Sequence, residues 1–240
     1  LKPYLINYIM KTIEHFVNGK SFSGESKKKG KIFNPATGEH EAEVKLATTK
    51  DVNEAVANAK KAFEVWSNKP PLQRARVMFK FKELIEKNSD ELTKIIVAEH
   101  GKVYDDAKGS LIRGLEVVEY ACGIPQMLKG EFTENVGTDV DSWSIRQPLG
   151  VCAGITPFNF PAMVPMWMFP MAIACGNTFV LKPSEKDPSC SMRLAELLKE
   201  AGLPDGDLNV INGDKEAVDT LMNNKDDAGM SLVGSKPIAT

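Results

Sequence analysis

The change of sequence pattern at Leu149 constrains the fold of this chain most strongly. From there on, short and almost continuously apolar segments alternate with segments of helical periodicity. The apolar segments are residues 151–155, 178–181, 208–211 and 230–233, with helices expected near 161–174, over 187–202 and over 215–223. Strands that recur every ~20–30 residues with a helix between them form βαβ units. We therefore expect an α/β fold, a parallel sheet buried by helices on both faces.

The first half of the chain has a helical pattern. Thr48 and Asp51 form a capping pair at the start of the first helix, and Ser89 caps a third helix that Gly101 ends. Residues 34–39 predict a turn between two strands. Apolar and polar residues alternate weakly over 131–147, which indicates an exposed strand or arm. Apolar side chains recur at helical spacing over residues 51–66, 72–87, 89–101 and about 105–121.

A stretch without charge runs from Gln147 to Leu181 and is long enough to raise the question of a membrane helix. Prolines at positions 157, 161, 165 and 170 interrupt it, so a strand, a buried helix and a second strand explain it better. The 30 Lys and Arg residues nearly balance 32 Asp and Glu residues, for a net charge of −2. We expect no membrane and no nucleic-acid partner.

The four cysteines lie at positions 122, 152, 175 and 190, with no CxxC motif among them. Each has an apolar or helical context without a neighbouring His or Lys, so we interpret them as reduced structural thiols and not as nucleophiles. The three histidines are dispersed, and we expect no metal site.

Polar residues follow the first expected strand, in the segment Thr156-Pro-Phe-Asn-Phe-Pro161. Ligands of parallel α/β sheets bind at the carboxyl ends of the strands. The Asn159 amide can donate a hydrogen bond to a developing oxyanion, or it can satisfy the backbone of a turn. Both interpretations of Asn159 remain open on the residues alone.

The second strand ends in Lys182-Pro-Ser-Glu185-Lys186. A cation and a carboxylate three residues apart can bind a ribose or a phosphate, and the alternative is a solvated loop. The fourth strand ends in Gly234-Ser235, where the start of a helix would offer backbone N–H groups to a phosphate. Neither a GxGxxG nor a Walker motif follows the first strand.

Arg113 lies in an otherwise apolar helical stretch, beside Gly114. Its guanidinium can form a forked contact with a substrate carboxylate, or it can extend along the helix surface into solvent.

Taken together, these motifs resemble the aldehyde dehydrogenase superfamily, and the resemblance covers nearly the whole chain. It rests on residues 156–161, Trp167-Met-Phe-Pro170, Gly176-Asn-Thr178, Lys182-Pro-Ser-Glu185, Ala201-Gly-Leu-Pro204 and Val233-Gly-Ser235. Phe158, the Met-rich stretch 161–175 and residues 113–119 are similar to the methylmalonate-semialdehyde dehydrogenase family within it. That resemblance implies oxidation of methylmalonate or malonate semialdehyde with NAD and acyl transfer to coenzyme A.

The resemblance also implies a role for each candidate residue. Asn159 matches the oxyanion-hole asparagine, and Arg113 matches the position that binds the substrate carboxylate. The remaining residues match cofactor contacts: Lys182 and Glu185 at the adenosine ribose, Lys186 beside them, Thr156 and Phe158 at the nicotinamide, and Ser235 at the pyrophosphate. A homotetramer of the full-length enzyme is implied as well.

The resemblance suggests a domain layout. Residues 1–15 are expected to be an N-terminal extension with Met10 as an alternative start, 16–130 the first part of the NAD-binding domain, and 131–148 an oligomerisation arm. Residues 149–240 are expected to be a truncated Rossmann-like core, preceded by the N-terminal helical segment. The nucleophilic Cys and the catalytic domain of the family would follow Thr240, so we expect the 240 residues alone to be inactive.

Two rival hypotheses remain. One is a non-acylating NAD-dependent aldehyde dehydrogenase, against which Arg113 argues. The other is a truncated NAD-binding remnant without activity. The cysteine usage and the absence of an Arg-rich leader favour a bacterial cytoplasm, with the mitochondrial matrix as the alternative.

Overall fold

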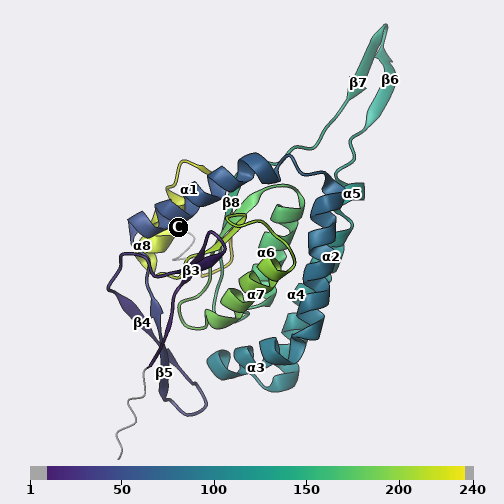
Figure 1. Ribbon diagram of the computed structural model, residues 1–240. Coiled ribbons are helices and arrows are strands. Elements are labelled where there is room, and N and C mark those ends of the chain that lie inside the picture. The colour runs from purple at the N-terminus through teal and green to yellow at the C-terminus, as the bar shows by residue number, and fades with distance from the viewer. Residues whose placement is uncertain (1–9, 236–240) are drawn as a thin grey trace, which may run out of the picture.

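A six-stranded sheet lies at the centre of the structure, a computed structural model that describes residues 10–235 (Figure 1). Four parallel strands come from the second half of the chain, and two short antiparallel strands from its beginning are added at one edge. In spatial order the strands are β11 (Asp227–Leu232), β8 (Val151–Ile155), β9 (Thr178–Lys182), β10 (Leu208–Val210), β2 (His15–Val17) and β3 (Lys20–Phe22).

Helices cover both faces of this sheet, which confirms the α/β expectation. One face packs α1 (Thr49–Trp66) and α8 (Lys215–Met222) against side chains such as Ala153 and Val180. The opposite face packs α6 (Met163–Ala174) and α7 (Ser189–Glu200) against Phe179 and its neighbours. All residues of β8, β9 and β10 are buried, as expected for strands covered on both sides.

A further layer of helices packs outside α6. It consists of α2 (Pro71–Lys87), α3 (Ser89–His100), α4 (Tyr104–Cys122) and the short α5 (Ile124–Met127). Helix α4 approaches α6 closely at Gly114, where an added Cβ would lie 2.3 Å from Met166 Cε. The Arg74 guanidinium of α2 is buried, and its Nε donates to the backbone oxygen of Ala174 at 2.9 Å. A cation thus balances the partial negative charge of the carbonyl groups at the end of α6.

The N-terminal part contains the two strands expected on either side of residues 34–39. A separate sheet contains β1 (Lys11–Ile13), β5 (His40–Lys45) and β4 (Lys29–Phe33), and the turn expected at residues 34–39 joins β4 to β5. His15 is fully buried in β2, so the described part of the expected extension 1–15 belongs to the fold from Lys11 onward. The part of that extension before Met10 lies outside the described residues.

Two helix starts test the capping expectations. Thr48 and Asp51 form the expected capping box at the start of α1. Helix α3 begins at Ser89, but no side chain caps it there. The preceding Asn88 instead turns its side-chain amide back to the Leu84 oxygen at 2.7 Å, because α2 and α3 follow one another directly. The expectation that Ser89 caps α3 was therefore wrong.

The segment 131–147, which was expected to be an exposed strand or arm, forms a hairpin that projects from the body of the molecule (Figure 1). Its strands are β6 (Phe132–Gly137) and β7 (Val140–Trp143), and every residue of both is exposed. The expected exposed strand is therefore confirmed. Among the described helices, none is both long enough and apolar enough to cross a membrane.

Asp207, at the start of β10, is fully buried, and its carboxylate oxygens have no hydrogen-bond partner among the described residues. Burial raises the pKa of Asp207 to about 8. Between about pH 4 and pH 8 the folded protein therefore keeps this carboxyl protonated, whereas the unfolded chain has lost the proton. The free energy of unfolding therefore falls as pH rises through this window. We expect Asp207→Asn to remove this dependence and to stabilise the protein at pH 8 by about 1–3 kcal/mol.

Urea unfolding at pH 5 and pH 8 measures the effect. Asp205→Asn, at an exposed position two residues earlier, is the matched control and should leave the pH dependence unchanged. Equal pH dependence in wild type and Asp207→Asn would contradict the assignment.

Candidate functional site

The carboxyl ends of three parallel strands meet at one edge of the central sheet. The Thr156 N–H donates to the Lys182 oxygen at 3.1 Å, and the Val233 N–H donates to the Ile155 oxygen at 3.1 Å. The chain enters β9 from α6 on one face and enters β11 from α8 on the other, so the connections diverge between β8 and β11. Open α/β sheets bind ligands at such a switch point.

The loop after β8 presents polar groups at this edge. Thr156 is buried, and its Oγ1 has no hydrogen-bond partner among residues 10–235. Asn159 is exposed, and no hydrogen bond joins its amide to any described residue. A turn-stabilising asparagine behaves differently: Asn34 Oδ1 accepts from the Ala36 N–H at 2.9 Å. The Asn159 amide is therefore free for a ligand.

Lys182, the last residue of β9, lies beside Glu185 in the loop that follows. Lys182 is 5% exposed, and its Nζ lies 3.1 Å from Glu185 Oε2. Lys182 projects to the same side of the sheet as Val180, toward α1 and α8, because side chains alternate along a strand. An ammonium carries three donors, and this one uses a single partner in the described structure. A buried charge of this kind does not fit a solvated loop.

Aromatic rings link the two loops to a segment that the sequence pattern did not single out. The Lys186 Nζ lies 5.0 Å from the centre of the Phe158 ring, and the His100 ring stacks on Phe158 at 6.1 Å with an interplanar angle of 21°. The Lys102 Nζ lies 3.8 Å from the centre of the Phe160 ring. His100 and Lys102 are about sixty residues away in the sequence, where no motif indicates this contact.

A buried and a half-buried carboxyl group, those of Asp187 and Glu99, lie next to the loop after β9. Burial and the nearby Glu99 carboxylate raise the pKa of Asp187 to about 8, so Asp187 is mostly protonated at neutral pH. Glu99 accepts hydrogen bonds from the Ser189 N–H at 3.0 Å and from the Ser189 hydroxyl at 2.5 Å. Glu99 therefore holds the first turn of α7, which begins just after this loop.

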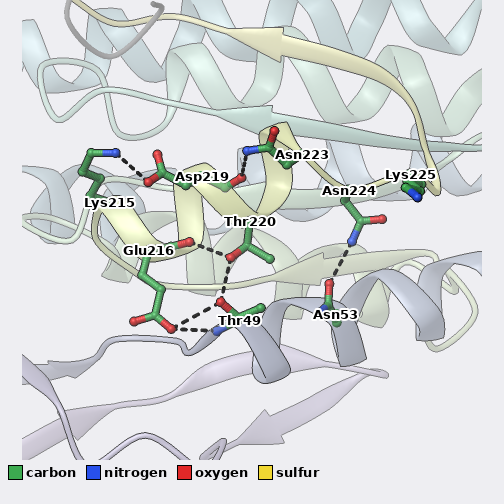
Figure 2. Close-up of a pocket in the computed structure, with 9 residues that line it drawn as sticks. All are labelled: Thr49, Asn53, Lys215, Glu216, Asp219, Thr220, Asn223, Asn224 and Lys225. Carbon is green, nitrogen blue, oxygen red and sulfur yellow. Dashed lines mark hydrogen bonds and ion pairs between the residues drawn. The ribbon is translucent and has the colours of Figure 1, made fainter.

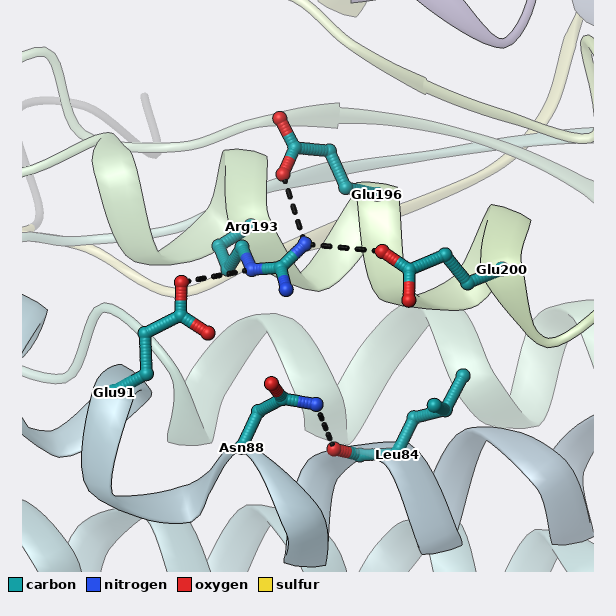
Figure 3. Close-up of polar contacts among 6 residues, drawn as sticks. All are labelled: Leu84, Asn88, Glu91, Arg193, Glu196 and Glu200. Atoms are coloured by element: carbon teal, nitrogen blue, oxygen red, sulfur yellow. Dashed lines mark hydrogen bonds and ion pairs between the residues drawn. The ribbon is translucent and has the colours of Figure 1, made fainter.

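A second set of contacts fixes α3 against α7. Figure 3 shows the Arg193 guanidinium between three carboxylates, with Nε 3.1 Å from Glu91 and Nη1 3.1 Å from Glu196 and 3.2 Å from Glu200. Glu91 belongs to the first turn of α3, whereas Glu99 belongs to its last turn. Both ends of α3 are thus bound to α7.

Two of the candidate residues are not in contact with this cluster. Arg113 is exposed on α4, one residue before the close approach of Gly114 to Met166 on α6. Helix α6 begins four residues after Asn159, so Arg113 lies on the helix that packs beside this loop. Ser235 is exposed beyond the end of β11, and no hydrogen bond joins it to another candidate among the described residues.

None of the four cysteines has the environment of a nucleophile. Cys122, Cys152 and Cys190 are buried, and Cys175 is half-buried. Burial raises the pKa of every one of these thiols, which keeps them protonated and unreactive at neutral pH. Residues 10–235 also contain no group of three or more His, Cys, Asp or Glu side chains placed to hold a metal ion.

Two hollows are lined by other residues. Figure 2 shows a groove of about 720 Å³ between α1 and α8, where Thr49 and Glu216 are hydrogen-bonded to each other. A second hollow of about 680 Å³ lies between the N-terminal sheet and helices α3 and α7. Neither contains a residue that the sequence singles out as a candidate.

Comparison with known proteins identifies the family. Residues 22–240 match the aldehyde dehydrogenase family. The match covers most of the chain, and the chain belongs to this family.

Three relatives illustrate the similarity. The chain is 54% identical over 230 residues to malonate-semialdehyde dehydrogenase of Pseudomonas aeruginosa, a match that covers 96% of this chain and 46% of the relative. It is 50% identical over 223 residues to the acylating, mitochondrial methylmalonate-semialdehyde dehydrogenase of Arabidopsis thaliana, covering 93% of this chain and 37% of the relative.

The third is a crystal structure, complexed with NAD, of a Sinorhizobium meliloti protein assigned as a methylmalonate-semialdehyde dehydrogenase. Its TM-score is 0.94 and its sequence identity 55%, over 97% of this chain and 47% of that chain. The chain thus spans about half the length, or less, of these relatives.

Proposed function

We propose that this chain is the NAD-binding part of a CoA-acylating dehydrogenase that oxidises malonate or methylmalonate semialdehyde. The observation that carries the proposal is the buried Lys182 ammonium beside Glu185, at the carboxyl edge where β8 and β9 end. The relatives named for these semialdehydes, one of them acylating, support the reaction.

The residues at this edge fit NAD. The Lys182 ammonium has donors to spare for a ribose oxygen, and Glu185 can accept from a ribose hydroxyl through the oxygen that Lys182 does not bind. The unpartnered Thr156 hydroxyl lies where β8 ends, and together with Phe158 it can contact the nicotinamide of NAD. Lys186 and Ser235 complete the proposed cofactor contacts.

When bound, NAD supplies the acceptor for the hydride of the aldehyde. This chain then contributes orientation and charge stabilisation. The Asn159 amide donates a hydrogen bond to the aldehyde oxygen as that oxygen gains negative charge, and such a donor contributes about 10²–10³-fold in rate. Arg113 binds the carboxylate that distinguishes a semialdehyde from a plain aldehyde. Coenzyme A is the proposed acyl acceptor.

The full-length enzyme is proposed to be a homotetramer in which the β6–β7 hairpin takes part. Its two strands expose Phe132 and Trp143, each about two-thirds exposed, at 65% and 67%. Apolar side chains of this size on a two-stranded ribbon favour a protein partner. We propose a cytoplasmic location, with the mitochondrial matrix as the alternative that the name of the plant relative supports.

The full-length protein should reduce NAD with malonate semialdehyde and form an acyl-CoA product at a rate that depends on coenzyme A. The assay follows NADH absorbance and identifies the product by mass spectrometry. Turnover that releases a free acid and ignores coenzyme A would favour the non-acylating alternative.

Arg113→Leu in the full-length protein should raise the KM for malonate semialdehyde by about 10- to 100-fold, because a charged hydrogen bond contributes about 1.5–3 kcal/mol. The kcat/KM for an uncharged aldehyde of similar size should stay within about two-fold. Arg76→Leu, at an exposed position of α2, is the matched control. An equal loss of kcat/KM for both substrates would show that Arg113 does not bind the carboxylate.

Lys182→Met and Glu185→Gln should each weaken NAD binding by about 10-fold or more, because each removes a charged partner of the ribose. Calorimetric titration with NAD measures the dissociation constant. Lys80→Met is the control, since Lys80 Nζ lies 2.9 Å from Glu83 in an exposed pair of the same spacing. Unchanged affinity in both site variants would place the cofactor elsewhere.

A further inference from the structure

The segment Glu99-His-Gly-Lys102 comprises the last two residues of α3 and the first two residues of its connection to α4. It contacts the loop after β8 and the first turn of α7. His100 stacks on Phe158, and Lys102 lies over Phe160. These two rings flank Asn159 in the sequence. The loop that carries Asn159 is thus held by one contact on each side of this residue.

The same segment is itself firmly anchored. Gly101 ends α3 in the left-handed conformation, with φ of +81°, and an added Cβ would lie 2.6 Å from Pro35 Cγ. Any residue with a side chain is strained there. Glu99 binds the first turn of α7 through Ser189, and Arg193 binds the opposite end of α3 through Glu91 (Figure 3). The segment therefore has a fixed position relative to the sheet edge.

We propose that His100 and Lys102 are positioning residues that hold the loop 156–161, so that the Asn159 amide points at the reacting oxygen. The stacked ring and the cation over a ring restrict the two residues beside Asn159 without occupying its donor group. Oriented donors stabilise charge only where they are fixed before the reaction. The inference rests on the proposed function for the role of Asn159, but the contacts that hold the loop are independent of it.

Hydrogen exchange tests the loop without any cofactor or substrate. Between Pro157 and Pro161 the exchanging amides belong to Phe158, Asn159 and Phe160. In His100→Leu and Lys102→Met these amides should exchange about 2- to 5-fold faster, as expected from the loss of a cation–π or stacking contact. His100→Phe keeps a ring and Lys102→Arg keeps a cation, so both should restore the wild-type rate.

A matched control distinguishes this effect from general destabilisation. The ring centres of His40 and Phe33 lie 5.5 Å apart in a similar His–Phe pair of the N-terminal sheet. His40→Leu should leave exchange in the loop 156–161 unchanged. Exchange in peptides from β9 and β10 reports global opening. Unchanged exchange in the loop of both His100→Leu and Lys102→Met, or equal acceleration in β9 and β10, would overturn the proposal.

Kinetics of the full-length enzyme supply the second readout. A displaced Asn159 should lower kcat by about 10-fold while the dissociation constant of NAD and the KM of the semialdehyde change little. The conservative variants His100→Phe and Lys102→Arg should recover kcat. A change in KM alone would contradict a positioning role. If the wild-type enzyme oxidises no aldehyde, the proposed function fails, and the exchange experiment still decides whether the segment holds the loop.

Discussion

Helix α6 determines how the other layers are arranged, because it is apolar almost all round and carries no charge. Such a helix is stable only where most of its surface is covered, and of its large side chains Trp167 is the one that stays exposed, at 46%. The sheet covers one side, and α2 and α4 cover another, with Gly114 allowing close approach. Trp66 and Arg74 donate to the backbone oxygens of Ile173 and Ala174 at its end. Because α6 begins four residues after Asn159, its burial also fixes the position of the end of this loop.

The charge balance at the sheet edge follows from which groups are buried. Lys102, Lys182 and Lys186 lie around the two loops, and the carboxylates of Glu185 and Glu99 lie in the same region. The neighbouring Asp187 is mostly neutral near pH 7 because burial raises its pKa to about 8. A neutral Asp187 therefore leaves these ammonium groups with one carboxylate fewer than the sequence indicates, in a chain with a net charge of −2. An anionic ligand meets less repulsion at this edge with a neutral Asp187 than it would with an ionised one.

Local patterns of the sequence were sufficient for much of the second half. The expected strand 151–155 is confirmed residue for residue. The three-residue spacing of Lys182 and Glu185 brings their charges into contact, because Lys182 ends β9 and Glu185 lies in the turn directly after it. Patterns of this kind depend on neighbours in the chain. The strand β2 was missed, since three residues show no period and their partner, β10, lies nearly 200 residues away. The stacking of His100 on Phe158 was missed for the same reason.

The β6–β7 hairpin differs from the rest of the chain in having almost nothing to pack against. An isolated two-stranded ribbon is marginally stable in water. Its free energy of local opening is accordingly expected to be far below that of the sheet, whose strands are buried on both faces. In a single chain the ribbon can therefore open while the sheet stays folded. A partner surface that covers the ribbon would also slow this opening.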